Sequence, residues 1–151
     1  IANAVGFNGM VGGQALDMAA QGKASTFEQL RLIHEQKTGA LFRAAVLSGA
    51  VCANATAQDM QRLDQFASTI GLAFQVADDI LDVTENSATL GKTAGKDIAV
   101  EKSTYVSCLG LEEAQNEAER LLAEAITCLN PYGDRAQPLA DLAIAMVRRK
   151  H

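Results

Sequence analysis

Apolar residues recur every three or four positions along almost the whole chain, and this spacing is the feature that most limits how it can fold. Residues spaced in this way line one face of an α-helix. The longest such segment, residues 57–84, has apolar side chains at Met60, Leu63, Phe66, Ile70, Phe74, Ala77 and Leu81. No segment shows the strict alternation that is typical of a half-buried β-strand. We therefore predict an all-α protein.

Glycines, prolines and polar links divide this pattern into five predicted helices and one long loop. The helices are expected at residues 4–20, 25–51, 57–84 and 111–129 and from Pro138 onward. Ser25 and Glu28 have the spacing of a capping box, which would begin the second helix. Residues 85–102 contain two glycines and three lysines and are expected to form an irregular basic loop. At 151 residues, the chain is long enough for a single domain with a sizeable core.

The charge and the cysteine content exclude several classes of function. The formal net charge is −5, so a basic surface for nucleic acid or for an anionic membrane is not expected. Cys52, Cys108 and Cys128 are widely spaced and form no CxxC pair, which argues against a disulfide framework or a zinc knuckle. We expect these cysteines to be small buried apolar residues of a protein in the reducing cytoplasm. Small-molecule chemistry and a protein partner both remain open.

Residues 74–82 carry the most informative pattern, Phe-Gln-Val-Ala-Asp-Asp-Ile-Leu-Asp. Its polar residues stand at i, i+3, i+4 and i+7, which would place them along one helix face: Gln75, Asp78, Asp79 and Asp82. Such a motif, taken alone, could equally be a solvated acidic face. The apolar residues around it instead favour a buried helix that a ligand approaches.

Three carboxylates on one helix face need a counter-charge. At about 6 Å and an effective dielectric constant of about 20, each pair repels by roughly 3 kcal/mol. The nearest cations downstream in the sequence are Lys92, Lys96 and Lys102. Because these carboxylates have no histidine or thiol near them in the sequence, oxygen ligands alone would select a hard ion such as Mg²⁺.

Two further groups of polar residues stand on predicted helices. Gln14 and Asp17 are one turn apart, although such a pair is more often ordinary surface. His34, Lys37 and Thr38 lie at i, i+3 and i+4 just before an apolar run, so they could hold a phosphate while a hydrocarbon tail lies deeper. The alternative is an amphipathic boundary with a lysine that extends to solvent.

The loop at residues 90–97, Leu-Gly-Lys-Thr-Ala-Gly-Lys-Asp, includes Gly-Lys-Thr without the rest of a P-loop. A nucleotide site is therefore not predicted. A basic loop directly after an acidic helix could still close over a metal-bound anion.

In their order along the chain, five segments closely resemble the bacterial farnesyl diphosphate synthases, which are trans-isoprenyl diphosphate synthases. They are Gly-Gly-Gln-Ala-Leu-Asp17, His34-x-x-Lys-Thr-Gly-Ala40, Phe74-Gln-x-x-Asp-Asp-Ile-Leu-Asp82, Leu90-Gly-Lys92 and Lys102-Ser-Thr-Tyr105. The resemblance implies an antiparallel helical bundle of the isoprenoid-synthase type, with residues 1–151 as the C-terminal part of its single domain. The family's first aspartate-rich motif and its isopentenyl diphosphate site are not in this sequence, so we expect the chain to be a fragment that is inactive alone.

The resemblance also implies roles for individual residues. Three Mg²⁺ ions would serve a complete active site, with Asp78 as a direct ligand, Asp79 and Asp82 acting largely through metal-bound water, and Asp17 assisting the other ions. Lys37 and Lys92 would hold the allylic diphosphate, Thr38 and Gln75 would face the carbocation, and Phe74 would line the pocket. Lys102 would belong to a closing loop, and the basic end at residues 148–150 would fold over isopentenyl diphosphate.

The implied activity is the condensation of isopentenyl diphosphate with dimethylallyl or geranyl diphosphate to give farnesyl diphosphate, in a homodimeric enzyme. A geranyl or geranylgeranyl diphosphate synthase is an alternative, because residues near the first motif set the product length. A non-catalytic subunit of a heteromeric prenyltransferase and a helical diphosphate-binding or Ca²⁺ module are the rivals from other classes. The residues at 37, 38, 75, 78 and 92 count against a purely structural subunit, and the absence of EF-hand spacing counts against a Ca²⁺ site.

Overall fold

The computed structural model describes residues 1–90 and 103–149, and the side chains of all these residues except 85–90. The described part consists of helices and contains no strand, which confirms the predicted all-α class. The elements are α1 (Ala2–Val5), α2 (Met10–Ala20), α3 (Phe27–His34), the π-helical turn η1 (Glu35–Gly39), α4 (Ala40–Cys52), α5 (Ala57–Leu90), α6 (Tyr105–Leu109), α7 (Leu111–Leu129), the 3₁₀ segment η2 (Asn130–Ala136) and α8 (Gln137–Val147).

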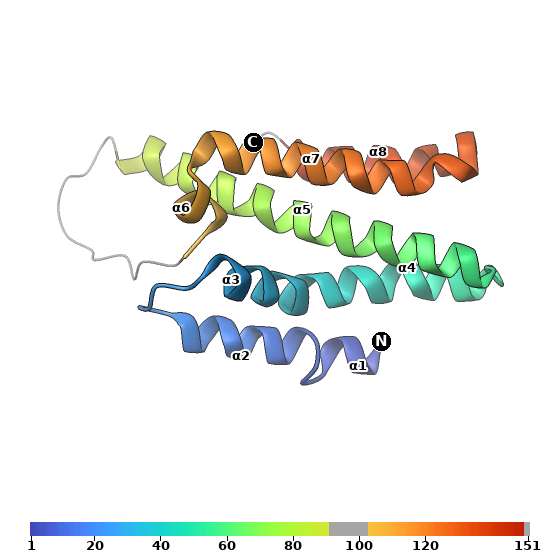
Figure 1. Ribbon diagram of the computed structural model, residues 1–151, viewed down its shortest axis with the longest axis horizontal. Helices are drawn as coiled ribbons and strands as arrows, with labels where there is room; N and C mark the ends of the chain where they lie inside the picture. The colour runs from blue at the N-terminus through green and yellow to red at the C-terminus, as the bar shows by residue number, and fades with distance from the viewer. Residues whose placement is uncertain (91–102, 150–151) are drawn as a thin grey trace.

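The long helix α5 is the centre of the bundle. Figure 1 shows it between α3–α4 on one side and α7–α8 on the other, with α1–α2 as the outer layer beyond α3. Its buried residues include Phe66, Ile70 and Val76, which belong to the same apolar core as Leu121 and Leu122 of α7. Because α5 is covered on both sides, each of its polar side chains must either contact a partner or lie on the strip of the helix surface that stays exposed.

Three predicted helix boundaries differ from the structure. The first predicted helix is interrupted at residues 6–9, where Gly6 and Gly9 favour a turn and the Gly9 N–H donates to the Gly6 carbonyl at 3.0 Å. The predicted capping box is wrong by one residue. Thr26 and Gln29 form it, because the extended backbone at Thr26 lets the Thr26 hydroxyl accept the Gln29 N–H at 3.2 Å. Helix α5 continues to Leu90, so only residues 91–102 of the predicted loop lie outside the described part.

The prediction of buried cysteines is also wrong. Cys52 and Cys108 are exposed and Cys128 is half-buried. Cys52 is the last residue of α4, and Cys108 lies in the short α6. The apolar pattern that marks a helix face extends to these positions, although the described residues leave both side chains exposed. Within the described residues, no helix is long and apolar enough to cross a membrane.

Candidate active site

In the aspartate motif of α5, Asp79 points in a different direction from Asp78 and Asp82. Asp79 is only 3% exposed, Asp78 is half-buried and Asp82 is exposed. Adjacent residues of an α-helix are rotated by about 100°, so Asp78 and Asp79 cannot share one direction. Asp78 pairs with the guanidinium of Arg149, which also lies 4.6 Å from the centre of the Phe74 ring. Among the described residues, the counter-charge at Asp78 is therefore Arg149, beyond the end of α8. The lysines that the sequence suggested, at positions 92, 96 and 102, lie outside the described residues.

Asp79 makes its contacts inside the bundle. Its Oδ2 accepts the backbone N–H of Tyr105 at 2.8 Å and lies 3.1 Å from Nε2 of His34. His34 is 3% exposed and Tyr105 is fully buried, and their rings stack with centroids 5.6 Å apart. No histidine is close to these aspartates in the sequence, but His34 reaches Asp79 in the folded chain. The two residues are 45 positions apart, so no local pattern reveals their contact.

The Tyr105 ring is enclosed by aromatic neighbours. The Phe27 ring meets it edge-on at 4.9 Å, opposite the stacked imidazole. Burial raises the pKa of the Tyr105 phenol, and its hydroxyl has no partner among the described residues. Tyr105 is therefore held by its ring and its backbone, and its hydroxyl is not placed for acid–base chemistry at neutral pH.

Lys37 and Asp17 form the second ionic contact of the site. Lys37 Nζ lies 2.6 Å from Asp17 Oδ2, and both side chains are partly buried. Lys37 and Thr38 belong to the π-helical turn η1, a type of turn that is frequent at functional sites. Gly13 of α2 lies against the backbone of this turn, since a Cβ there would be only 2.2 Å from the Lys37 nitrogen. The close approach of the two backbones brings Asp17 within reach of Lys37.

The remaining predicted residues are divided by the limits of the described chain. Thr38, Phe74 and Gln75 are half-buried, whereas Gln14 is exposed. Arg148, expected in a tail over the substrate, pairs with Glu119 at 2.6 Å. Four lysines named in the sequence lie outside the described residues: Lys92, Lys96, Lys102 and Lys150.

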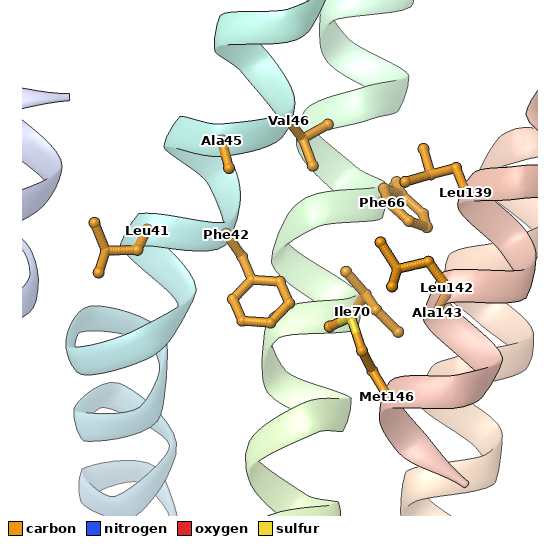
Figure 2. A pocket seen from close by; sticks show the side chains of 10 residues that line it. All are labelled: Leu41, Phe42, Ala45, Val46, Phe66, Ile70, Leu139, Leu142, Ala143 and Met146. Carbon is orange, nitrogen blue, oxygen red and sulfur yellow. The ribbon is translucent and has the colours of Figure 1, made fainter. Parts of the chain in front are cut away.

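An apolar groove adjoins this polar region (Figure 2). It lies between α4, α5 and α8 and has a volume of about 330 Å³. Its lining residues are all apolar: Leu41, Phe42, Ala45, Val46, Phe66, Ile70, Leu139, Leu142, Ala143 and Met146. Figure 2 shows Phe42 extending from α4 toward α5, where its ring meets that of Phe74 with centroids 5.4 Å apart. Ile70 precedes Asp78 by eight positions on α5, which corresponds to about 12 Å of helix.

Asp78 and Asp82 are the described carboxylates that could contribute to a metal site. No group of three or more His, Cys, Asp and Glu side chains within the described residues is close enough to hold an ion. Asp78 and Asp82 nevertheless stand one turn apart, and Asp78 already faces a cation, the guanidinium of Arg149. Carboxylate oxygens in this arrangement fit a hard divalent ion that takes its other ligands from water and from a phosphate. Asp17 lies with Lys37, and Asp79 lies inside the bundle.

One helical bundle thus contains a half-buried carboxylate, a lysine on a π-helical turn and an apolar groove. These features together define a class of proteins suited to an anionic ligand with a hydrocarbon tail. The chain belongs to the polyprenyl synthetase family, whose model, described as "Polyprenyl synthetase", matches residues 4–137.

Relatives and a solved structure agree with this assignment. The chain is 44% identical over 152 residues to a geranylgeranyl diphosphate synthase of Cyanophora paradoxa, an alignment that covers 100% of this chain and 51% of that protein. It is 47% identical over 137 residues to the farnesyl diphosphate synthase of Escherichia coli K12, covering 90% and 46%. A geranyltransferase from Helicobacter pylori, solved with magnesium and isoprenyl diphosphate, superposes with a TM-score of 0.74 at 34% identity, covering 97% and 48%. The chain thus spans about half the length of the relatives it matches.

Proposed function

We propose that this chain forms part of a trans-prenyltransferase that condenses isopentenyl diphosphate with an allylic diphosphate. The observation that carries this proposal is the position of the apolar groove about two helical turns from Asp78 on the same helix. An allylic diphosphate has both an anionic head and an apolar tail, so it needs both features at about this separation. The magnesium and isoprenyl diphosphate in the related geranyltransferase support the same ligand class.

The residues of this chain would share the work of binding and ionising the substrate. When bound, Mg²⁺ supplies positive charge that makes diphosphate a good leaving group, and we propose three ions per complete site. Asp78, with Asp82 and Asp17, would hold these ions. Lys37 would leave Asp17 to bind the diphosphate, with Lys92 and Lys102 as further cations. Opposite charge fixed in a site of low polarity stabilises the departing diphosphate more than water does.

The allylic carbocation needs protection as well as stabilisation. Thr38 and Gln75 carry oxygens that we propose face the cation, and Phe74 presents its ring between the groove and Asp78. The apolar lining of the groove excludes the water that would otherwise trap the cation as an alcohol. The alkene of isopentenyl diphosphate would then attack the cation to form the new carbon–carbon bond, and the released diphosphate would take up the proton whose loss completes the product.

Farnesyl diphosphate is the product that we propose, and geranylgeranyl diphosphate is the main alternative. The relatives named above include synthases of both kinds. We further propose a homodimer in the cytoplasm. A non-catalytic subunit is disfavoured because a purely structural subunit has no need of Lys37, Thr38, Gln75, Asp78 and Lys92 together.

The test is a product assay of the complete enzyme with Mg²⁺, isopentenyl diphosphate and dimethylallyl diphosphate, analysed by mass spectrometry. A C15 diphosphate is expected, whereas a C10 or C20 product would assign the enzyme to the alternative synthases. Asp78→Ala is expected to lower turnover by orders of magnitude with little loss of folding, since this side chain is half-buried at the edge of α5. Unchanged turnover in this variant would contradict the metal-ligand role, and the chain assayed alone is expected to be inactive.

A further inference from the structure

Asp79 is placed differently from the two other aspartates of its motif. Its side chain is buried, and its Oδ2 receives two donors, the Tyr105 N–H at 2.8 Å and the His34 ring at 3.1 Å. Because a carboxylate only accepts hydrogen bonds, the proton of this contact lies on Nε2 of His34. One carboxylate oxygen offers two lone pairs, and both are used here. Oδ2 therefore has no free lone pair for an ion or for the water of an ion, and the burial of the residue, which is 3% exposed, keeps a hydrated ion away from Oδ1.

The two donors come from segments that are far apart in the sequence. His34 ends α3 and lies three residues before Lys37, in one continuous helical run. Tyr105 begins α6, which lies against both α3 and α5 (Figure 1). Just before it, the hydroxyl of Ser103 accepts the N–H of Ser25 at 3.0 Å, so the same stretch is also fastened to the start of α3.

This arrangement couples three parts of the molecule at one carboxylate. Asp79 follows Asp78 directly on α5, and its partner His34 is the residue from which the turn η1, which carries Lys37, begins. The stacked rings of His34 and Tyr105 keep the two donors together. Nδ1 of His34 has no partner within the described residues, so the contact with Asp79 is the polar contact that orients this ring. A shift of Asp79 would therefore move Lys37 relative to Asp78.

We propose that Asp79 is a positioning residue and not a magnesium ligand. It sets the separation between Asp78, which would hold metal, and Lys37, which would hold diphosphate. This inference rests on the proposed function and replaces the water-mediated metal role that the family resemblance implied for Asp79. Breaking a buried, charge-assisted contact of this kind costs more than losing an exposed one, because the remaining donors are left unpaired.

The test compares the same isosteric change at two adjacent residues, Asp78→Asn and Asp79→Asn, in the complete enzyme. Two quantities are measured: the Mg²⁺ concentration that gives half-maximal binding of an allylic diphosphate, and the hydrogen-exchange rate of the Tyr105 amide. Asp79→Asn is expected to leave the Mg²⁺ requirement unchanged and to speed Tyr105 exchange severalfold, because a neutral amide oxygen is a weaker acceptor. Asp78→Asn is expected to raise the Mg²⁺ requirement and to leave the Tyr105 exchange rate unchanged.

Asp79→Ala separates positioning from stability. Loss of the acceptor should speed Tyr105 exchange on the order of tenfold or more. It should also raise the KM for the allylic diphosphate, because Lys37 is displaced. The control is Leu129→Ala, which removes a buried side chain at the end of α7 remote from Asp79 and should lower stability without changing this KM. If Asp79→Ala does not fold, the isosteric Asp79→Asn variant still supplies both readouts of the first comparison.

Three results would overturn the inference. The first is a Mg²⁺ requirement that rises in Asp79→Asn as much as in Asp78→Asn. The second is an unchanged rate of Tyr105 exchange in both Asp79 variants. The third is a KM for the allylic diphosphate that changes no more in Asp79→Ala than in Leu129→Ala. An unchanged Mg²⁺ requirement in Asp78→Asn would instead refute the metal role of Asp78 in the proposed function. The Tyr105 and KM measurements would then still decide the role of Asp79.

Discussion

The contact between α2 and η1 gives a prediction that can be worked out from distances, the effect of Gly13→Ala. A Cβ at Gly13 would lie 2.2 Å from the Lys37 nitrogen, 2.6 Å from Lys37 Cα and 2.8 Å from the Gln36 carbonyl carbon. Ordinary contact begins at 3.4 Å, so the backbones must separate by at least about 1.2 Å. All three atoms belong to the main chain, and no flexible side chain can move aside to relieve the clash.

The expected cost follows from two opposing effects. Overpacking of this severity destabilises by about 3 kcal/mol, while alanine in a helix gains about 1 kcal/mol over glycine. Gly13→Ala should therefore lower the free energy of unfolding by about 2 kcal/mol, and the melting temperature by roughly 4–8 °C for a chain of this size. The separation should also lengthen the Lys37–Asp17 contact, now 2.6 Å, and weaken diphosphate binding.

Urea unfolding followed by circular dichroism measures this effect, with Gly49→Ala as the matched control. Gly49 lies inside α4, and a Cβ there would meet no atom within 4 Å. That substitution should stabilise the chain by about 0.5–1 kcal/mol through helix propensity alone. If Gly13→Ala were as stable as Gly49→Ala, the close packing of α2 on η1 would be refuted.

Three other predictions address the ligand, the groove and acid stability. Lys37→Ala should weaken binding of the allylic diphosphate by about tenfold or more through loss of a charge-assisted contact, as calorimetry would measure, and an unaltered affinity would contradict its role. Ala45→Phe should narrow the groove and shorten the main product found by mass spectrometry, an expectation that fails if product length is unchanged. Hydrogen bonds from the Thr56 and Tyr132 hydroxyls hold the pKa of Asp59 below its ordinary value. The stability that these two hydrogen bonds contribute is therefore present at neutral pH and is lost as the pH falls below about 4. Tyr132→Phe should flatten this part of the stability curve in acid unfolding experiments, and an unchanged curve would show that the Tyr132 contact with Asp59 does not matter.

Helical periodicity predicted the main elements because burial on one face of a helix leaves a trace every three or four residues. The start of α5 at Ala57 and the span of α7 were read in this way. The cap of α3 was misplaced because Ser25–Glu28 and Thr26–Gln29 have the same spacing and chemistry. The π-helical turn η1 left no local sequence signal, since its hydrogen bonds depend on how α2 and α5 pack against it.

The partners of the aspartates were beyond local reasoning for a different reason. Arg149 is 71 positions from Asp78, and His34 is 45 from Asp79. Both residues were noted in the sequence, His34 beside Lys37 and Arg149 in the basic end of the chain. Neither pattern carries information on which helix lies opposite, because that is decided by the packing of the whole bundle. The sequence therefore predicted which charged residues belong to the site better than it predicted which of them form pairs.

The pairing also explains how the three carboxylates of the motif fit on one helix. The value of roughly 3 kcal/mol of repulsion per pair holds for carboxylates that face each other. In the structure Asp79 turns inward to His34, and Asp78 turns to Arg149, so two of the three carboxylates are separated by direction and each has its own donor. Lys37 offsets Asp17 in the same way. Partly exposed ion pairs of this kind contribute at most about 1 kcal/mol each, less than a divalent ion gains from the same oxygens together with a diphosphate. Under the proposed function, Arg149 and Lys37 are therefore the partners that ligand binding displaces, whereas the buried contacts of Asp79 persist through the cycle.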